Sequence, residues 1–265
     1  MSVDPLLRVD GLEVVIRSGG ADSKTVVDGV SLRVEEGERI GLVGESGSGK
    51  SLTALAILGL VPETGELRAG RVLVDGVDAG GITDLRGGSI GLVMQDAASA
   101  LNPVYSVGYQ LVETIKAHGA GGGDARQTVL DLLAEVALED AESMFSAYPH
   151  QLSGGQAQRV MIALALAGEP RIVIADEPTT ALDVITQAQI LELLVRITDE
   201  RGLGLILVSH DLAVVAQLTH RVVVLHQGRV VEEGPVEEVL RNPNHDATRR
   251  MVVAAARMNA GEAIA

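Results

Sequence analysis

The 265-residue chain has no cysteine and no tryptophan, and it contains only one phenylalanine and three tyrosines. Without cysteine it can form no disulfide, no thiolate zinc site and no cysteine-held iron–sulfur cluster. Basic residues are also scarce: 21 stand against 36 acidic residues, and the formal net charge is −15. Because binding nucleic-acid phosphates requires clustered Lys and Arg, this balance argues against a nucleic-acid partner. Solubility is the simpler explanation of the acidity.

Long apolar runs are missing as well. The longest, such as Val160–Ala167, are far shorter than the ~20 residues that a bilayer span requires. The first residues show no charged segment followed by an apolar run, so no secretory signal is predicted. Mean hydropathy is nonetheless +0.26, which fits a buried sheet plus an apolar interface. We therefore expect a soluble, cytoplasmic protein with a substantial core, as one large α/β domain or a core plus a small insertion.

A glycine-rich stretch organises the chain. Gly44-Glu45-Ser46-Gly47-Ser48-Gly49-Lys50-Ser51 fits the pattern Gly-x4-Gly-Lys-Ser, between an apolar stretch at 39–43 and a predicted helix at Leu52–Leu60. In this strand–loop–helix context, backbone N–H groups can surround nucleotide phosphates, Lys50 can reach them, and the Ser51 hydroxyl can ligate Mg²⁺. The alternative is a Gly/Ser-rich turn that happens to precede a lysine. Since the chain has only three lysines, we favour the phosphate loop.

Apolar periodicity predicts how strands and helices alternate. Strand patterns occur at 6–16, 26–34, 171–175, 204–208 and 221–225, and a hairpin-like pair is expected at 70–75 and 89–94. Helix patterns occur at 107–118, 127–136, 184–200 and 211–218, and the loop Gly119–Asp124 is given no function. Strands that alternate with helices indicate a mostly parallel sheet. We expect a split α/β core with an antiparallel flank and an α-helical insertion.

Two adjacent acids follow the apolar strand pattern at 171–175. A core strand has no structural use for paired carboxylates at its C-terminal end, where α/β folds place ligands. Asp176 is suited to hold Mg²⁺, and Glu177 is suited to polarise the water that attacks a γ-phosphate. An ordinary exposed strand end is the alternative.

A second turn suited to anions occurs at Leu152-Ser153-Gly154-Gly155-Gln156, ahead of an apolar helix. Two glycines and a serine at a helix N-terminus can bind an anion. One triphosphate does not need two such turns from one chain. The economical explanation is that this turn contacts the γ-phosphate held by the phosphate loop of a second copy. A simple helix N-cap is the alternative.

Taken in order, these motifs resemble the nucleotide-binding subunit of ATP-binding cassette (ABC) transporters. The resemblance extends over about residues 6–250 and includes Gln95, Ala181-Leu182-Asp183 and Ser209-His210-Asp211. It implies a P-loop NTPase fold of the α/β class, with a mixed, mostly parallel core sheet, an antiparallel β flank and an α-helical insertion. It also implies ATP and Mg²⁺ as ligands.

The resemblance implies a role for each matched residue. Gln95 would sense Mg²⁺ and the γ-phosphate, His210 would contact the γ-phosphate and support Glu177, and Asp183 would lie across a dimer interface. The implied catalytic residues are Glu177, His210 and Gln95, and the implied metal ligands are Ser51, Gln95 and Asp176. The implied nucleotide-binding residues are Gly44, Glu45, Ser46, Gly47, Ser48, Gly49, Lys50, Ser51, Leu52, Ser153, Gly154, Gly155, Gln156 and Asp183.

The predicted division of the chain follows the same pattern. Residues 1–95 and 160–240 would form the split nucleotide-binding core with its antiparallel β subdomain. Residues 96–159 would form an α-helical signature subdomain, and 241–265 a C-terminal helical tail.

The finer pattern resembles the peptide/nickel importer subfamily, in the stretches 44–52, 94–96, 101–105, 148–153, 175–183 and 242–249. Such importers combine two ATP-binding subunits, identical or paralogous, with two transmembrane permeases and an extracytoplasmic substrate-binding protein. The implied function is ATP hydrolysis that drives import of di- or oligopeptides, or of nickel chelates, from a peripheral position on the cytoplasmic face of the inner membrane. A permease would contact Asp96–Tyr109. The short, cysteine-free C-terminus is more similar to the nickel type.

One departure from the family pattern is the absence of any aromatic residue before Tyr105. The family usually stacks adenine on an aromatic ahead of the phosphate loop, so we expect a contact near Arg17–Val26 to replace it. Two other functions are alternatives: a soluble cassette ATPase of translation or DNA repair, and an exporter cassette. The single cassette, the 56 residues between Gln95 and Leu152 and the charge of −15 disfavour the first, and the lack of a membrane span disfavours the second. A phosphate-loop kinase does not explain the turn at 152–156.

Overall fold

The computed structural model describes residues 4–17, 23–78, 88–119, 123–180 and 182–262. The chain divides into two compact units. The first combines Met1–Thr83 with Gly204–Ala265, and the second is Asp84–Leu203.

The first unit contains an antiparallel sheet with the strand order β2-β1-β4-β5. Its strands are β1 (Leu7–Arg17), β2 (Ser23–Val34), β4 (Gly65–Val74) and β5 (Val77–Asp78). Buried and exposed residues alternate along much of β1 and β2, as expected when one face of an antiparallel sheet packs on a core. The strands predicted at 6–16 and 26–34 are confirmed, and β2 begins three residues earlier than predicted.

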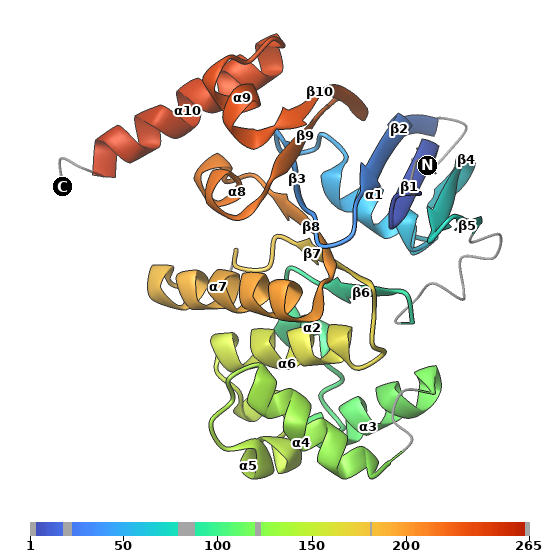
Figure 1. Cartoon of the computed structure of the whole chain (residues 1–265), viewed down its shortest axis with the longest axis vertical. Helices are drawn as coiled ribbons and strands as arrows, with labels where there is room; N and C mark the ends of the chain where they lie inside the picture. The colour runs from blue at the N-terminus through green and yellow to red at the C-terminus, as the bar shows by residue number, and fades with distance from the viewer. Residues whose placement is uncertain (1–3, 18–22, 79–87, 120–122, 181, 263–265) are drawn as a thin grey trace. The chain divides into compact units, whose positions relative to one another are not determined.

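The first unit also contains the central strand β3 (Arg39–Gly44), which pairs in parallel with β8 (Gly204–Ser209) and with β9 (Arg221–His226). Strand β10 (Arg229–Pro235) pairs antiparallel with β9, and β8, β3 and β9 lie side by side (Figure 1). Ile40, Leu42 and Val43 are completely buried, which is typical of a parallel strand covered on both faces. The helices of this unit are α1 (Lys50–Ile57), α8 (Leu212–Leu218), α9 (Val236–Arg241) and α10 (Asp246–Glu262).

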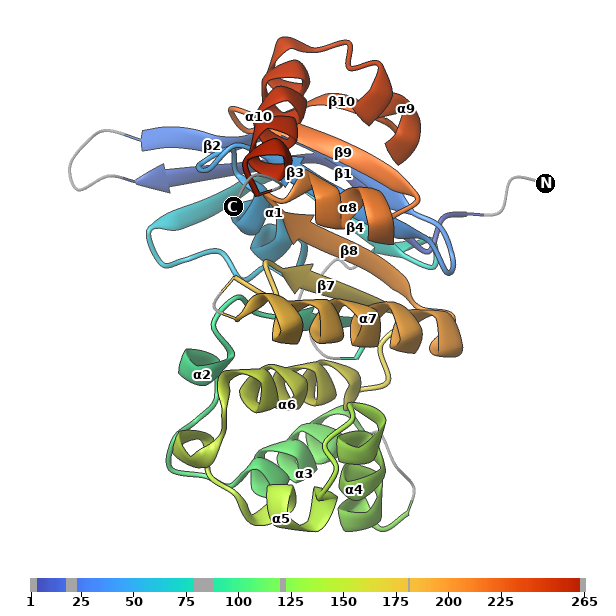
Figure 2. The ribbon, with the colours of Figure 1, turned by 90° about the vertical axis from the view of Figure 1, so that its left-hand side faces the viewer.

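The second unit is mainly helical, around one parallel pair of strands, β6 (Ile90–Val93) and β7 (Ile172–Asp176). Its central element is α6 (Gly154–Leu166), which packs against β6 and against the helices α2, α3, α4 and α7 (Figure 2). The apolar residues of α6 are therefore mostly buried. The other helices are α2 (Ala97–Ala100), α3 (Val107–His118), α4 (Ala125–Glu135), α5 (Ala141–Ser146), the 3₁₀ turn η2 (Pro149–Gln151) and α7 (Val184–Arg201).

The hairpin predicted from 70–75 and 89–94 is wrong. Strand β4 pairs with β1 and β5, whereas β6 pairs in parallel with β7. A Cβ atom at Gly91 would lie 2.3 Å from the carbonyl oxygen of Ala165, so β6 is a core strand closely covered by α6. Such a short apolar run does not reveal its partner, because buried strands lack the alternation that distinguishes a hairpin.

No helix within the described part of the chain combines the length and the apolar character needed to cross a membrane. The helices predicted at 107–118, 127–136, 184–200 and 211–218 are confirmed to within two residues at each end.

Candidate nucleotide-binding site

The phosphate loop lies between β3 and α1, as predicted. Gly49 precedes the helix with a φ of +102°, and a Cβ atom there would lie 2.9 Å from the carbonyl oxygen of Val26. Only glycine adopts this conformation without strain in so little space. The loop therefore turns sharply into the helix N-terminus, whose free N–H groups favour an anion.

The side chain of Lys50 is held inside this loop. Its Nζ donates hydrogen bonds to the carbonyl oxygens of Gly44 and Glu45, at 2.9 and 3.2 Å, and the residue is only 6% exposed. The Ser48 hydroxyl is buried and has no hydrogen-bond partner among the described residues, whereas Ser51 is exposed on the first turn of α1. An ammonium, a helix N-terminus and an accessible hydroxyl together fit a polyphosphate and its Mg²⁺.

The turn between β9 and β10 is hydrogen-bonded to the phosphate loop, although it lies about 180 residues later in the sequence. Gln227 and Gly228 join β9 to β10 with left-handed φ angles of +50° and +81°. The Gly228 N–H donates to the Ser48 carbonyl at 2.9 Å, and its own carbonyl accepts from the Asp28 N–H at 2.8 Å. A Cβ atom at Gly228 would lie 2.3 Å from the carbonyl oxygen of Val26. Sequence analysis missed this residue; the only signal was a Gln-Gly pair between two strand-forming runs.

His210 lies at the same edge of the sheet as the phosphate loop. Val43, near the end of β3, pairs with Ser209 at the end of the parallel strand β8. Parallel strands end at a common edge, so His210 follows β8 where the phosphate loop follows β3. The next residue, Asp211, fixes the start of α8 by accepting a hydrogen bond from the Ala213 N–H at 2.8 Å.

In the second unit, polar residues likewise follow the ends of two neighbouring parallel strands. Val93 of β6 pairs with Ala175 of β7, so Gln95 follows one strand where Asp176 and Glu177 follow its neighbour. The Glu177 backbone has a φ of +45°, a conformation that is uncommon for residues other than glycine and that occurs often at functional sites. The Thr180 hydroxyl donates to Glu177 Oε2 at 2.9 Å and orients the carboxylate.

The turn at 153–156 and Asp183 also lie together in the second unit. Ser153 and Gln156 form a reciprocal capping box at the start of α6: the Gln156 side chain accepts from the Ser153 N–H at 2.9 Å, and the Ser153 hydroxyl accepts from the Gln156 N–H at 3.3 Å. A Cβ atom at Gly155 would lie 2.7 Å from Cγ2 of Thr186, in the first turn of α7. The helix N-cap, which is the alternative interpretation of this turn, is therefore present.

Asp183 caps the neighbouring helix α7. Its carboxylate accepts hydrogen bonds from the N–H groups of Ile185 and Thr186, at 3.1 and 3.0 Å, and from the Thr186 hydroxyl at 2.7 Å. These bonds, those from Thr186 above all, lower the pKa of Asp183. The caps of α6 and α7 thus hold Ser153–Gln156 and Asp183 on adjoining helix ends.

The predicted site residues are therefore distributed over two units. The phosphate loop and His210 belong to the first unit, and Gln95, Ser153–Gln156, the two acids and Asp183 belong to the second. Of the region expected to replace the adenine-stacking aromatic, residues 18–22 lie outside the described residues, and Arg17 donates to Glu66 at 2.9 Å. Half of the loop Gly119–Asp124, residues 120–122, lies outside them too.

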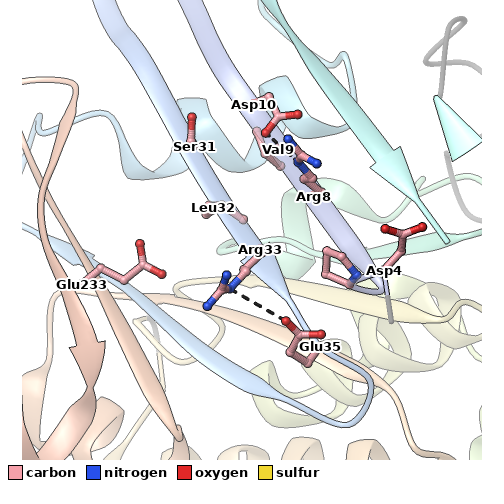
Figure 3. Close-up of a pocket in the computed structure, with 10 residues that line it drawn as sticks. Asp4, Arg8, Val9, Asp10, Ser31, Leu32, Arg33, Glu35 and Glu233 are labelled. Carbon is pink, nitrogen blue, oxygen red and sulfur yellow. Dashed lines mark hydrogen bonds and ion pairs between the residues drawn. The ribbon is translucent and has the colours of Figure 1, made fainter. Parts of the chain in front are cut away.

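A hollow of about 600 Å³ in the first unit contains none of these residues (Figure 3). It is lined mainly by β1 and β2 and by Glu233 of β10. Two of its arginines pair with two of its acids, Arg8 with Asp10 at 2.9 Å and Arg33 with Glu35 at 3.8 Å. Both arginines that line the hollow are therefore paired with its acids, and we assign it no ligand.

A strand, a glycine-rich phosphate loop with its lysine, and a helix in this order define a P-loop nucleotide-binding protein. Comparison with known families narrows the class. The ABC transporter family matches residues 27–180. The dipeptide transport ATP-binding protein DppD of Escherichia coli K12 is 44% identical over 253 residues, which are 93% of this chain and 77% of DppD.

Two further relatives agree. The peptidoglycan transport ATP-binding protein YejF of Agrobacterium fabrum is 44% identical over 260 residues, which cover 96% of this chain and 47% of YejF. The solved dimeric structure of the ATP-binding cassette MJ0796, bound to ADP and Pi, superposes with a TM-score of 0.75 at 31% identity, over 87% of this chain and 98% of that one. The chain belongs to the ABC transporter family.

Membership establishes the fold class and the activity. The chain has the P-loop cassette fold, with parallel and antiparallel strands and a large helical portion. It is an ATP-binding, ATP-hydrolysing subunit that supplies energy to a transporter.

Proposed function

We propose that this chain is the ATPase of an importer for di- or oligopeptides. The proposed mechanism rests mainly on one observation: a single chain has two turns suited to binding anions, at 44–51 and at 153–156. The 44% identity to DppD, over 93% of the chain, supports a peptide as the transported solute. The proposed importer adds two permeases and an extracytoplasmic binding protein, and the chain would lie on the cytoplasmic face of the inner membrane.

In the proposed site, residues 44–52 bind the phosphates of ATP. Lys50 donates to the β- and γ-phosphates once nucleotide displaces the two carbonyls that it now contacts. Ser51, Gln95 and Asp176 would hold Mg²⁺, which neutralises phosphate charge when bound. Glu177 orients and deprotonates the attacking water, and His210 donates to the γ-phosphate and supports that carboxylate.

The second turn completes the site of another cassette. In this proposal Ser153–Gln156 and Asp183 of one subunit contact the nucleotide on the phosphate loop of its partner, which is either a second copy or a paralogue. The dimeric MJ0796 cassette supports this arrangement. Since Ser153 already caps α6, its hydroxyl group is preorganised at the helix N-terminus rather than recruited from a flexible loop.

For the subdomains we propose the division predicted from the sequence, with 1–95 and 160–240 as the core, 96–159 as the helical part and 241–265 as the C-terminal tail. The helical part offers an exposed apolar and aromatic patch for a permease. Val104, Tyr105 and Tyr109 are 70%, 45% and 47% exposed, and the two tyrosine rings stack at 4.6 Å. Large exposed apolar side chains that cluster in this way are typical of interaction surfaces.

An uptake experiment tests the proposal. Cells that lack this chain would be supplied with a labelled di- and tripeptide mixture or with labelled Ni²⁺, and complemented with the wild type or with Glu177→Gln. We expect loss of peptide uptake, restored by the wild type only. Loss of nickel uptake alone would make the solute a metal chelate, and unchanged uptake of both would refute the proposed solute class.

A further inference from the structure

The carboxylate of Glu45, in the phosphate loop, is contacted by the C-terminal part of the chain. Nε and Nη2 of Arg250, on α10, both lie 3.3 Å from Glu45 Oε1. Nδ1 of His226, at the end of β9, lies 3.8 Å from Oε2. Nitrogen atoms from two distant elements therefore face the two oxygens of one carboxylate. The established activity gives this contact no role.

The segment that delivers Arg250 is itself fixed to the sheet. Glu232 of β10 accepts hydrogen bonds from the N–H groups of Asn244 and His245, at 2.7 and 3.0 Å. Burial raises the pKa of Glu232, but these bonds outweigh it and hold the pKa below its ordinary value. Nδ1 of His245 accepts from the Ala247 N–H at 3.2 Å, and its ring lies 5.9 Å from the ring of His226. The start of α10 is thus anchored beside the phosphate loop.

Helix α10 also packs against α8, α9 and β3 (Figure 2). Ala247 and Thr248 in its first turn are each 1% exposed. The helix therefore has a buried face at its start, and Arg250 extends from the next turn toward the loop. Movement of this helix would move the guanidinium away from Glu45.

The position of Glu45 matters for nucleotide because its backbone carbonyl accepts from Lys50 Nζ at 3.2 Å. The same residue thus carries an acceptor for the phosphate-binding lysine and a negative charge on the loop. A carboxylate released toward bound phosphates would repel them, whereas one paired with a guanidinium is neutralised and held aside.

We propose that Arg250 is a positioning residue for the phosphate loop, and that through Glu45 it couples docking of the C-terminal helix α10 to ATP binding. The inference rests on the assignment of residues 44–51 as the phosphate loop. Docked α10 raises the affinity for ATP, and by linkage bound ATP stabilises docked α10 by the same factor. A partner that pulls α10 away would lower ATP affinity without touching the nucleotide.

The coupling is modest because the pair is accessible to water. The side chains of Arg250 and Glu45 are 56% and 45% exposed, and exposed ion pairs change an equilibrium by a factor of about 2 to 5. The neighbouring residue offers a matched control. Arg249 pairs with Asp246 on its own helix at 2.6 Å, so it has the same charge and a similar position but a different partner.

The first test measures ATP affinity of the full-length protein by calorimetry in Mg²⁺ buffer. We expect Arg250→Ala to weaken binding by a factor of about 2 to 5 and Arg249→Ala to leave it unchanged. In Glu45→Gln, where no charge remains to be held, adding Arg250→Ala should have no further effect. Equal affinities of Arg250→Ala and the wild type, or additive effects in the double variant, would overturn the inference.

The second test measures the docking of α10 directly, from the rates of amide hydrogen exchange at residues 247–257 with and without ATP. In the wild type ATP should slow exchange in this helix, and in Arg250→Ala it should not. ATP-independent exchange in the wild type would remove the coupling. A wild type that does not bind ATP at all would instead refute the assignment of the phosphate loop, and the inference with it.

Discussion

Glu177 combines two features that a purely structural residue rarely has. It is a carboxylate at the end of a buried strand, and its φ is +45°. The Thr180 hydroxyl donates a hydrogen bond to its carboxylate at 2.9 Å. Such local strain costs of order 1 kcal/mol, which the surrounding fold must offset.

Glu177→Gln should retain ATP binding and lose hydrolysis by a factor of about 10² to 10⁴, because the amide keeps the shape but cannot act as a base. Phosphate release under saturating ATP and Mg²⁺ measures the loss. Glu169→Gln is the matched control: Glu169 also has a left-handed backbone, with φ +54°, but it is exposed after α6. Undiminished turnover in Glu177→Gln would remove Glu177 from the role of base.

Gly228→Ala should destabilise the protein more than Gly202→Ala. Both positions have a left-handed φ, +81° and +64°, but only at Gly228 would the new Cβ meet a backbone atom, Val26 O at 2.3 Å. We expect Gly202→Ala to lower the free energy of unfolding by about 1 kcal/mol, because of the backbone conformation alone. Gly228→Ala should lower it by about 3 kcal/mol, because the steric clash adds to the conformational cost. Urea unfolding at neutral pH compares the two. Equal losses of stability in the two variants would show that the turn at Gly228 can shift to accept a Cβ atom, and that it does not support the phosphate loop.

At the scale of elements, one arginine joins four strands of the first unit. Arg221 begins β9 and donates to Glu38, just before β3, from Nε at 2.8 Å and from Nη2 at 3.1 Å. It also donates to the carbonyl of Arg33 on β2 and pairs with Glu233 on β10. The side chains of Arg221 and Glu38 are only 13% and 15% exposed, so water screens this pair less than the surface pairs elsewhere.

Burial raises the pKa of the Glu38 carboxyl, but the hydrogen bonds from Arg221 and from Glu35, with the nearby positive charge, hold the pKa below its usual value. A carboxyl with a lowered folded-state pKa stabilises above its unfolded pKa of about 4.3, and this contribution is lost as pH falls through the folded pKa. Glu38→Gln should therefore cost about 2 kcal/mol at pH 7 and clearly less below pH ~4.

Urea unfolding at the two pH values checks this expectation. Glu63→Gln makes the same chemical change at an exposed position of the same unit and should shift neither midpoint. A cost for Glu38→Gln that is the same at both pH values would mean that packing, and not charge, holds these strands together.

At the scale of the whole molecule, the two anion-binding turns predict a nucleotide-dependent dimer. With ATP and Mg²⁺, Glu177→Gln should be dimeric, because ATP stays bound between two cassettes. Adding Ser153→Arg should leave ATP binding intact and return the protein to a monomer, since a bulky cation replaces the small cap of α6. Light scattering after gel filtration measures the mass.

The control for this experiment is Ser146→Arg, at the exposed end of α5, which should remain dimeric in the same background. A dimer that survives Ser153→Arg would defeat the two-cassette model and leave the capping box of α6 as a purely structural feature.

The sequence by itself determined the local elements and the class of protein. The helices at 107–118 and 184–200 follow from apolar spacing, and the phosphate loop follows from glycines and a lysine between a strand and a helix; these signals lie within a few residues of one another. Sequence patterns also indicated the strand that ends in Asp176 and Glu177, and they allowed both a cap and an anion site at Ser153.

Only the tertiary structure decided which distant segments meet. β6 pairs with β7 and not with β4, because any strand offers the same backbone groups and burial selects the partner. Gly228 supports Ser48, and Arg250 reaches Glu45 across 205 positions of the chain. Neither contact can be predicted from a local sequence pattern. Each joins residues that are far apart in the chain, and it forms only because the sheet and the helices pack together around the phosphate loop.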